Sequence, residues 1–154
     1  MRLRPFARAD INTLYRIDQI CFTPGIAYSE AELGYYLQYP KSITLVAETQ
    51  TRSIAGFCIG QVYAREGKTI GHIITIDVLP DARRQGTGRL LLCAIEEHFR
   101  TKKVGLIRLE VAIDNLHAQA FYRAMGYARI GTIPNYYAGR LDALVMHKAL
   151  MADA

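Results

Sequence analysis

Residues 83–89 read Arg-Arg-Gln-Gly-Thr-Gly-Arg and stand between an apolar run that ends at Pro80 and a helical run from Gly88 to Arg100. Glycine lets a backbone approach a ligand closely, and the free N–H groups at the start of a helix bind phosphate oxygens with the help of the helix dipole. Three arginines add positive charge to the same turn. This order of strand, turn and helix predicts a site for a phosphate-bearing ligand.

A solvated loop whose glycines only turn the chain is the alternative, and the flanking strand and helix weaken it. A dinucleotide site would need Gly-x-Gly-x-x-Gly near a first strand and an acidic residue about 20 residues later, and a Walker loop would need Gly-x-x-x-x-Gly-Lys before Ser or Thr. The chain has neither pattern at this turn. A phosphate-bearing cofactor remains, and the turn alone does not identify it.

The chain before this turn is predicted to hold two helices and four strands. We expect a strand at residues 2–6, a helix capped by Asp10 with Ile11, Leu14, Ile17 and Ile20 on its apolar face, and a loop from Phe22 to Tyr28. Ser29 and Glu32 have the spacing of a capping box, and this second helix ends near Pro40. An antiparallel meander is expected from the β-rich runs Ile43–Glu48, Ile54–Tyr63 and His72–Leu79.

The chain after the turn alternates helices with strands. The helix from Gly88 to Arg100 presents an apolar face made by Leu91, Leu92, Ile95 and Phe99. Leu106–Ile113 is a strand, and a helix runs from Asp114 or Asn115 through Met125 to a left-handed cap at Gly126. The last two strands are Tyr127–Ile133 and Ala143–Lys148, so the pattern is mixed α/β.

Length and composition indicate a single globular unit. The 154 residues fit one core, so we expect one domain over residues 1–150 and a tail at 151–154. Hydrophobic residues make up 51% and charged residues 21%, which excludes a disordered chain. No run is as apolar and long as a signal peptide core or a membrane helix, so we expect a cytoplasmic protein that meets no membrane.

Cysteine, histidine and charge narrow the class of ligand. Cys21, Cys58 and Cys93 are odd in number and lack Cys-x-x-Cys spacing, so we expect buried thiols in a reducing compartment. The four histidines are scattered, and no metal is expected. The net charge of +5 favours an anionic ligand, which could be nucleic acid, a phosphorylated cofactor or an acidic protein surface.

The turn at residues 83–89 has the form Arg-x-x-Gly-x-Gly and resembles the acetyl-CoA-binding motif of the GNAT acetyltransferases. The resemblance extends to Leu109-Glu110-Val111, Asn115, Ala120–Tyr127 and Asn135-Tyr136-Tyr137, and within the family it is similar to ribosomal-protein alanine acetyltransferases and to catalytic subunits of N-terminal acetyltransferases. It implies an α/β (α+β) GNAT fold, with a mixed central sheet of about seven strands, splayed at the cofactor site and flanked by about four helices.

The resemblance also implies a cofactor site for acetyl-CoA as co-substrate. Backbone groups of Ile76, Asp77 and Val78 would pair with the pantetheine arm. The pyrophosphate would lie on Arg83, Arg84, Gln85, Gly86, Thr87, Gly88 and Arg89. Asn115 matches the family asparagine that contacts the cofactor, and it can also serve as a helix N-cap.

Glu110 and Tyr122 match the family pair to which proton transfer is assigned. Glu110 would accept the proton of the attacking amine, directly or through water, and Tyr122 would donate to the departing thiolate. The structural alternative for Glu110 is an ion pair with Arg108 or Lys148. The alternative for Tyr122 is packing beside Phe121 on a helix face.

The acceptor implied by the resemblance is the N-terminal α-amino group of a protein or peptide, with a ribosomal protein among the candidates. Two loops of the relatives grip its first residues, and here they carry Ile26 and Tyr28, and Tyr136 and Tyr137. Surface or core packing is the alternative, and it is favoured for Tyr35, Tyr36 and Tyr39. A small amine such as a polyamine or antibiotic, or a non-catalytic acyl-CoA-binding subunit, are the competing functions. A monomer or small homo-oligomer is expected.

Three features depart from the bacterial pattern or stand outside it. Asp77 replaces a small apolar residue, so its carboxylate either faces the acceptor or pairs with a histidine such as His72. The first loop has proline and glycine where the bacterial enzymes often have tryptophan. A basic patch of Arg100, Lys102, Lys103 and Arg108 could bind nucleic acid, but solvated charge or the 3′-phosphate of the cofactor explains it more simply, and no specific nucleic acid is expected.

Overall fold

The protein, seen in a computed structural model that describes residues 1–150, is built on one seven-stranded sheet in the order β1-β2-β3-β4-β5-β7-β6. The predicted tail at 151–154 lies outside the described residues. The elements are β1 (Arg2–Pro5), α1 (Ile11–Cys21), α2 (Glu30–Gln38), β2 (Ser42–Glu48), β3 (Ile54–Arg65), β4 (Lys68–Val78), α3 (Thr87–Thr101), β5 (Leu106–Ala112), α4 (Leu116–Ala124), β6 (Ala128–Tyr137) and β7 (Leu141–Ala149).

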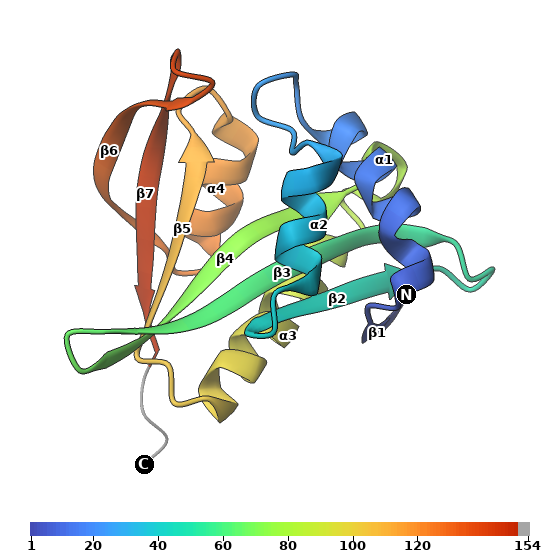
Figure 1. The fold of residues 1–154 in the computed structure, drawn as a ribbon, viewed down its shortest axis with the longest axis horizontal. Helices are drawn as coiled ribbons and strands as arrows, with labels where there is room; N and C mark the ends of the chain where they lie inside the picture. The colour runs from blue at the N-terminus through green and yellow to red at the C-terminus, as the bar shows by residue number, and fades with distance from the viewer. Residues whose placement is uncertain (151–154) are drawn as a thin grey trace.

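Two apolar cores cover the two faces of the sheet. Leu14 and Leu33 bring α1 and α2 onto one face, where they pack against Phe57 of β3. Leu91 and Phe99 anchor α3 on the opposite face, and α4 joins the same core. Figure 1 shows α2 in front of the sheet and α3 behind it. Each amphipathic helix thus buries one stripe against the sheet, as helical spacing of the apolar residues requires.

The predicted order of elements is confirmed, including the antiparallel meander of β2, β3 and β4. The capping box also forms, because the Glu32 amide donates to Ser29 Oγ at 3.1 Å and the Ser29 amide donates to Glu32 Oε1 at 3.0 Å. Gly126 has φ +97°, the left-handed cap expected after α4. Strand β4 begins at Lys68, four residues before the predicted start, because a hairpin turn pairs Lys68 with Arg65.

Two details of α1 were predicted wrongly. The Asp10 carboxylate does not cap α1; it accepts from the Ala7 amide at 2.8 Å and from Arg4 at 2.8 Å and 2.9 Å, so it joins β1 to the start of the helix. Ile20 is 60% exposed and lies off the apolar stripe.

Of the three thiols predicted to be buried, Cys58 is buried, Cys21 is partly buried and Cys93 is exposed on α3. The prediction for Cys93 was wrong because the residue faces away from the sheet while Leu92 faces it. Over residues 1–150, no helix is long and apolar enough to cross a membrane.

The sheet opens between β4 and β5, as predicted. These two strands run parallel and pair only over Ile70–His72 with Leu106–Arg108. Beyond that point they diverge, and β5 continues beside β7 (Figure 1). A bulge accompanies the divergence, because Thr75 pairs with Ile59 while Ile73 pairs with Gly60, which leaves Ile74 as an extra residue in β4. The bulge changes which side chains of β4 face α1 and α2.

Candidate active site

The turn between β4 and α3 leaves the start of a helix uncapped. Gly86 is the N-cap residue, has φ +80°, and makes no side-chain cap hydrogen bond. A Cβ added to Gly86 would meet no heavy atom within 4 Å, so the backbone here is open. Thr87 instead turns its hydroxyl inward, where it donates to the Ala82 carbonyl at 3.2 Å. The first N–H groups of α3 are therefore available to an anion, which fits a pyrophosphate.

The predicted basic residues of this turn divide into two groups. Arg83 Nε donates to the Val78 carbonyl at 2.9 Å, so this side chain is held against the end of β4. Arg84 and Arg89 are exposed, and Gln85 closes the turn by donating to the Asp81 carbonyl at 2.9 Å. Arg84 and Arg89 are the arginines best placed to supply free charge to a bound phosphate.

The edge of β4 that faces the opening offers backbone groups of Ile76 and Val78. The Leu79 amide donates to the Ala55 carbonyl at 2.9 Å, and Asp77 stands two residues earlier in the same register. Because hydrogen-bonded pairs recur at every second residue of an antiparallel ladder, Asp77 turns its backbone groups toward β3. Of the three residues expected to pair with pantetheine, Ile76 and Val78 therefore face the opening and Asp77 does not.

Asn115 is the N-cap of α4. Its Oδ1 accepts from the Ala118 amide at 3.1 Å, so the structural role foreseen for it is present. This places the residue at the start of the second helix on the α3 side of the sheet, while its amide nitrogen makes no hydrogen bond within residues 1–150. That nitrogen is free to contact a ligand.

Glu110 lies on β5 and gathers donors from three strands. His72 Nε2 of β4 is 2.9 Å from its Oε1 and 3.1 Å from its Oε2, Arg108 Nε is 3.2 Å from Oε2, and the Tyr136 hydroxyl donates to Oε1 at 3.1 Å. Burial raises the pKa of Glu110, but His72 and Arg108 outweigh burial and hold this pKa below its ordinary value. The ion pair with Arg108 confirms one structural alternative, whereas Lys148 pairs with Glu96 instead.

The two segments predicted to hold the acceptor meet beside Glu110, but Tyr136 and Tyr137 lie at the end of β6 and not in the loop that was predicted to carry them. A Cβ added at Gly25, in the loop that carries Ile26, would lie 3.1 Å from Ala138 in the turn after Tyr137. The Tyr28 hydroxyl donates to the Ile74 carbonyl at 3.3 Å, at the bulge of β4. Ile26 is half-buried in the same loop, where its own amide and that of Ala27 both donate to the Thr23 carbonyl at 3.0 Å.

Tyrosine rings line this junction. Tyr136 and Tyr137 stack edge to face at 4.9 Å between ring centroids, and Tyr28 contacts Tyr36 of α2 at 5.3 Å. Burial and the nearby Glu110 carboxylate together raise the pKa of Tyr136 to about 12, so the phenol stays a proton donor near neutral pH. These rings form an aromatic wall over a carboxylate.

Tyr122 of α4 is 8% exposed and packs beside Phe121 at 5.3 Å and Tyr127 at 5.7 Å between centroids. Its hydroxyl makes no hydrogen bond within residues 1–150. Burial raises the pKa of Tyr122, with further contributions from Asp77 and Tyr137. Burial raises the pKa of Tyr137 as well, and the charge of Glu110 adds to this shift.

Two other expectations are corrected by the geometry. His72 pairs with Glu110, so it is not the partner of Asp77, which is 1% exposed and contacts Thr75. Arg108 lies on the sheet face of Glu110, whereas Arg100 and the two following lysines sit on or after the end of α3, on the other face. The expected patch is therefore divided, and its lysines lie at the opposite end of α3 from the turn at residues 83–89.

Sequence reasoning missed His72 and Tyr36 as members of the site. His72 precedes the bulge and so shares the face of Glu110, and a register argument between β4 and β5 could have found it. Tyr36 was assigned to packing, yet it contacts Tyr28 and its pKa is raised by burial and also by the charge of Glu110. No group of three or more His, Cys, Asp or Glu side chains within residues 1–150 could hold a metal ion.

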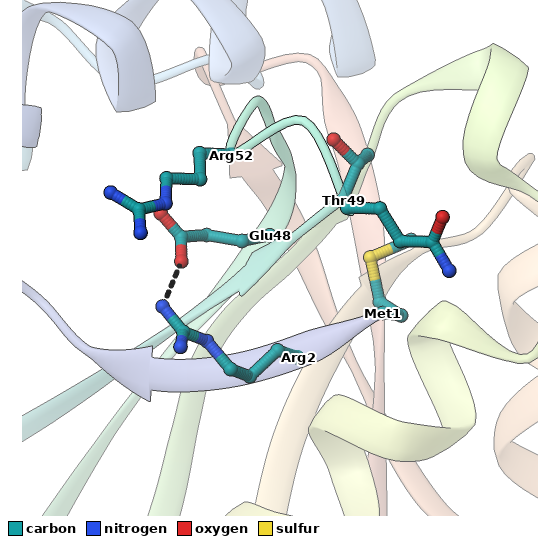
Figure 2. Close-up of a pocket in the computed structure, with 6 residues that line it drawn as sticks. Met1, Arg2, Glu48, Thr49 and Arg52 are labelled. Atoms are coloured by element: carbon teal, nitrogen blue, oxygen red, sulfur yellow. Dashed lines mark hydrogen bonds and ion pairs between the residues drawn. The ribbon is translucent and has the colours of Figure 1, made fainter.

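Two surface pockets lie away from Glu110. A pocket of about 290 Å³ is formed at β1 and the β2–β3 turn by Met1, Arg2, Glu48, Thr49, Gln50 and Arg52, where Arg2 bridges to Glu48 at 2.9 Å (Figure 2). A groove of about 720 Å³ follows β2 and β3 between the ends of α2 and α3. Neither is lined by a residue that the sequence assigned to the site.

Comparisons with known proteins agree with this arrangement. The profile described as the acetyltransferase (GNAT) family matches residues 11–127. An uncharacterized N-acetyltransferase of Methanocaldococcus jannaschii is 32% identical over 149 residues, which cover 96% of this chain and 91% of the relative. N-alpha-acetyltransferase 20 of Dictyostelium discoideum is 33% identical over 125 residues, which cover 79% of this chain and 72% of that protein.

Solved structures show the same architecture. The crystal structure of the ribosomal-protein-S18-alanine N-acetyltransferase from Escherichia coli matches with a TM-score of 0.85 at 26% identity, over 99% of this chain and 96% of that chain. The likeness therefore spans both the turn at residues 83–89 and the segments around Glu110.

Proposed function

The chain belongs to the acetyltransferase (GNAT) family, and from this premise we propose that it transfers the acetyl group of acetyl-CoA to the N-terminal α-amino group of a protein or peptide. The family resemblance and the GNAT fold expected from the sequence are both confirmed. The observation that carries the proposal is the junction over Glu110 between the loop that holds Ile26 and Tyr28 and the end of β6, which holds Tyr136 and Tyr137. A tyrosine ring packs on a side chain while its hydroxyl bonds peptide groups, which suits an extended peptide end.

The residues of the opening fit acetyl-CoA. The free amides at the start of α3, with Arg84 and Arg89, would hold the pyrophosphate. The outward backbone groups of Ile76 and the amide of Val78 would pair with the pantetheine arm, because the Val78 carbonyl already accepts from Arg83 and Cys21. When bound, acetyl-CoA supplies an activated thioester. The relatives named as an N-alpha-acetyltransferase and as a ribosomal-protein-S18-alanine N-acetyltransferase support this interpretation of the site.

The amine proton is assigned to the pair of His72 and Glu110. An α-amino group has a pKa of about 7.7 to 8.0, so a useful fraction is neutral near pH 7 and needs only a modest base. Glu110 stays ionised because its pKa is lowered, and it can attract the protonated amine and orient His72. The other ring nitrogen, Nδ1 of His72, makes no hydrogen bond within residues 1–150 and is free to take the proton, directly or through water.

Tyr122 is assigned the opposite task. Its buried phenol remains protonated at neutral pH because burial raises its pKa, and its hydroxyl is not used by other groups within residues 1–150. It can therefore donate a hydrogen bond and then its proton to the departing sulfur.

A peptide screen tests the proposed acceptor. Thiol release from acetyl-CoA is measured with peptides that differ only in their first two residues, with the same peptides blocked by an N-formyl group but carrying a free lysine, and with spermidine. We expect acetylation of unblocked peptides alone, located at the α-nitrogen by mass spectrometry. Acetylation of the blocked peptides or of spermidine at comparable rates would reject the α-amine as the acceptor.

A further inference from the structure

Two aspartates meet in the interior beneath the acceptor loop, and the proposed chemistry uses neither. Asp18 of α1 is 0% exposed and Asp77 of β4 is 1% exposed. Neither forms an ion pair with Lys, Arg or His within residues 1–150. Buried carboxylates without a cationic partner are rare because burial penalises the charged form.

One carboxylate oxygen of each aspartate accepts a hydrogen bond. Asp18 Oδ2 accepts from the Tyr28 amide at 2.7 Å, and Asp77 Oδ1 accepts from the Thr75 hydroxyl. Asp18 Oδ1 and Asp77 Oδ2 are buried and have no donor. The two carboxyl groups are within hydrogen-bonding reach of each other. Two adjacent acceptors that both lack a donor are satisfied when one proton lies between them.

The surroundings favour retention of that proton. Burial raises the pKa of Asp77 well above its ordinary value and also raises that of Asp18. Arg83, after β4, is the cation that opposes this shift at Asp77, while Glu32 of α2 adds to it at Asp18. The other titratable neighbours are Cys21 of α1, Cys58 of β3 and Tyr122 of α4, and burial raises the pKa of each, so they stay uncharged.

The pair sits among contacts that join the acceptor loop to β4. Tyr28 donates its amide to Asp18 and its hydroxyl to the Ile74 carbonyl of β4. Cys21 Sγ, at the start of the loop, donates to the Val78 carbonyl at 3.4 Å. The loop that carries Ile26 and Tyr28 is therefore tied at several points to the strand whose edge faces the cofactor opening.

We propose that Asp18 and Asp77 share one proton, and that this hydrogen-bonded acid pair is a positioning device that fastens the acceptor loop to β4. The part of the inference that concerns the acceptor rests on the proposed function. Loss of the shared proton places two negative charges side by side in the interior, where they repel, and frees the loop. The loop is then held best at low and neutral pH and released as the pH rises.

The sign of the pH dependence follows from linkage. Because the folded pKa of the pair is raised, the folded protein holds more protons than the unfolded chain above the ordinary pKa of aspartate, so stability falls as pH rises toward the folded pKa. Asp77→Asn keeps the shape, and its amide NH₂ donates permanently to Asp18. The wild type should therefore lose thermal stability relative to this variant as the pH rises above the ordinary pKa of aspartate.

Hydrogen exchange of the Tyr28 amide tests whether the acid pair holds the loop, and it needs neither an acceptor nor acetyl-CoA. Wild type and Asp77→Asn should protect this amide equally at low pH, and protection in the wild type alone should fall as pH rises. Asp77→Ala, which removes the partner, should speed exchange by about an order of magnitude at every pH. Glu66→Gln, an exposed acid in the β3–β4 turn, is the matched control and should change nothing.

The kinetic readout is the ratio of acceptor KM values for wild type and Asp77→Asn on the same peptide, in which titration of the peptide amine cancels. This ratio should stay near one at neutral pH and rise at alkaline pH, with kcat little changed. The proposal is overturned if Asp77→Asn exposes the Tyr28 amide as Asp77→Ala does, or if exchange is the same in all four proteins. Should Asp77→Ala fail to fold, the pH dependence of Tyr28 amide exchange in the wild type and in Asp77→Asn still tests the proposal. Failure of the peptide screen alone would reject the acceptor and leave the exchange result standing.

Discussion

His72 Nε2 bridges both carboxylate oxygens of Glu110, at 2.9 Å and 3.1 Å, so one imidazole of β4 is locked onto one carboxylate of β5. Tyr136 and Arg108 occupy further acceptor positions of the same carboxylate. A carboxylate with this many donors is a weak base and a strong orienting group, because each donor stabilises its ionised form. The free nitrogen of His72 is consequently the more accessible proton acceptor.

Glu110→Gln and His72→Gln test this division of roles. We expect each variant to lower kcat by about 100-fold or more while the acetyl-CoA Kd stays within a factor of about two. Because the pKa of Glu110 is lowered, its ionised form persists at neutral pH and is lost only in acid. Exogenous imidazole should restore part of the activity of His72→Gly and none of Glu110→Gly. Absence of rescue, with normal folding, would return the base to Glu110.

Tyr122→Phe removes only the phenolic hydroxyl of a buried ring. The ring contacts with Phe121 and Tyr127 remain, so stability and acetyl-CoA affinity should change little. Turnover should fall by about 100-fold, the usual contribution of a positioned acid. Single-turnover kinetics and calorimetric binding of acetyl-CoA separate the two effects. Unchanged turnover would remove Tyr122 from the proton path.

Gly86→Glu places bulk and negative charge at the proposed phosphate turn. Gly67 offers a matched control, because its φ of +77° is close to the +80° of Gly86 and an added Cβ is equally unhindered. Each substitution should cost about 1 to 2 kcal/mol of stability through the left-handed backbone alone. Only Gly86→Glu should abolish binding of acetyl-CoA, as measured by calorimetry. Equal affinity in both variants would place the cofactor elsewhere.

Lys148→Met tests a buried network on the α3 side of the sheet. Lys148 Nζ is 3.0 Å from Glu96 Oε2 and 2.8 Å from the Met125 carbonyl, and the Tyr127 hydroxyl donates to Glu96 at 2.7 Å. Removing the cation leaves Glu96 buried, so the free energy of unfolding should fall by about 3 kcal/mol. The exposed pair of Glu97 and Arg100 provides the contrast.

Glu97→Gln breaks that exposed pair at 3.1 Å, where solvent already screens the charges. Its effect on the free energy of unfolding should not exceed about 0.5 kcal/mol. Urea denaturation of both variants gives the comparison. Equal losses would show that burial does not distinguish the two pairs.

Much of the fold was predictable because it depends on local patterns, namely the spacing of apolar residues and the residues that cap helices. Apolar spacing located α3, and Ser29 with Glu32 located the start of α2. The bulge at Ile74 was not predictable, since it depends on how β4 pairs with β3 and leaves no mark in the residues themselves. The prediction for Ile20 was wrong because each step of three residues falls about 60° short of a full helical turn, which carries Ile20 off the stripe that Leu14 and Ile17 bury.

The site was predictable where one segment carries it and not where strands bring distant residues together. The turn around Gly86 could be interpreted from its own sequence and its neighbours. His72 meets Glu110 only because β4 and β5 pair in parallel, and Asp18 meets Asp77 only because α1 packs on β4 beyond the bulge. Asp77 was recognised as unusual, but its partner lies 59 positions earlier in the chain.

The short parallel contact between β4 and β5 has a consequence for how the molecule unfolds. With pairing limited to Ile70–His72 and Leu106–Arg108, the sheet consists of two smaller sheets joined by a narrow hinge and by the helices behind it. The amides of a bound pantetheine arm, lying along the open edge of β4, would act as an added strand that connects the two halves of the sheet. Ligand binding would then set the cooperativity of unfolding. The two halves should unfold as one unit when the ligand is bound and more independently when it is absent.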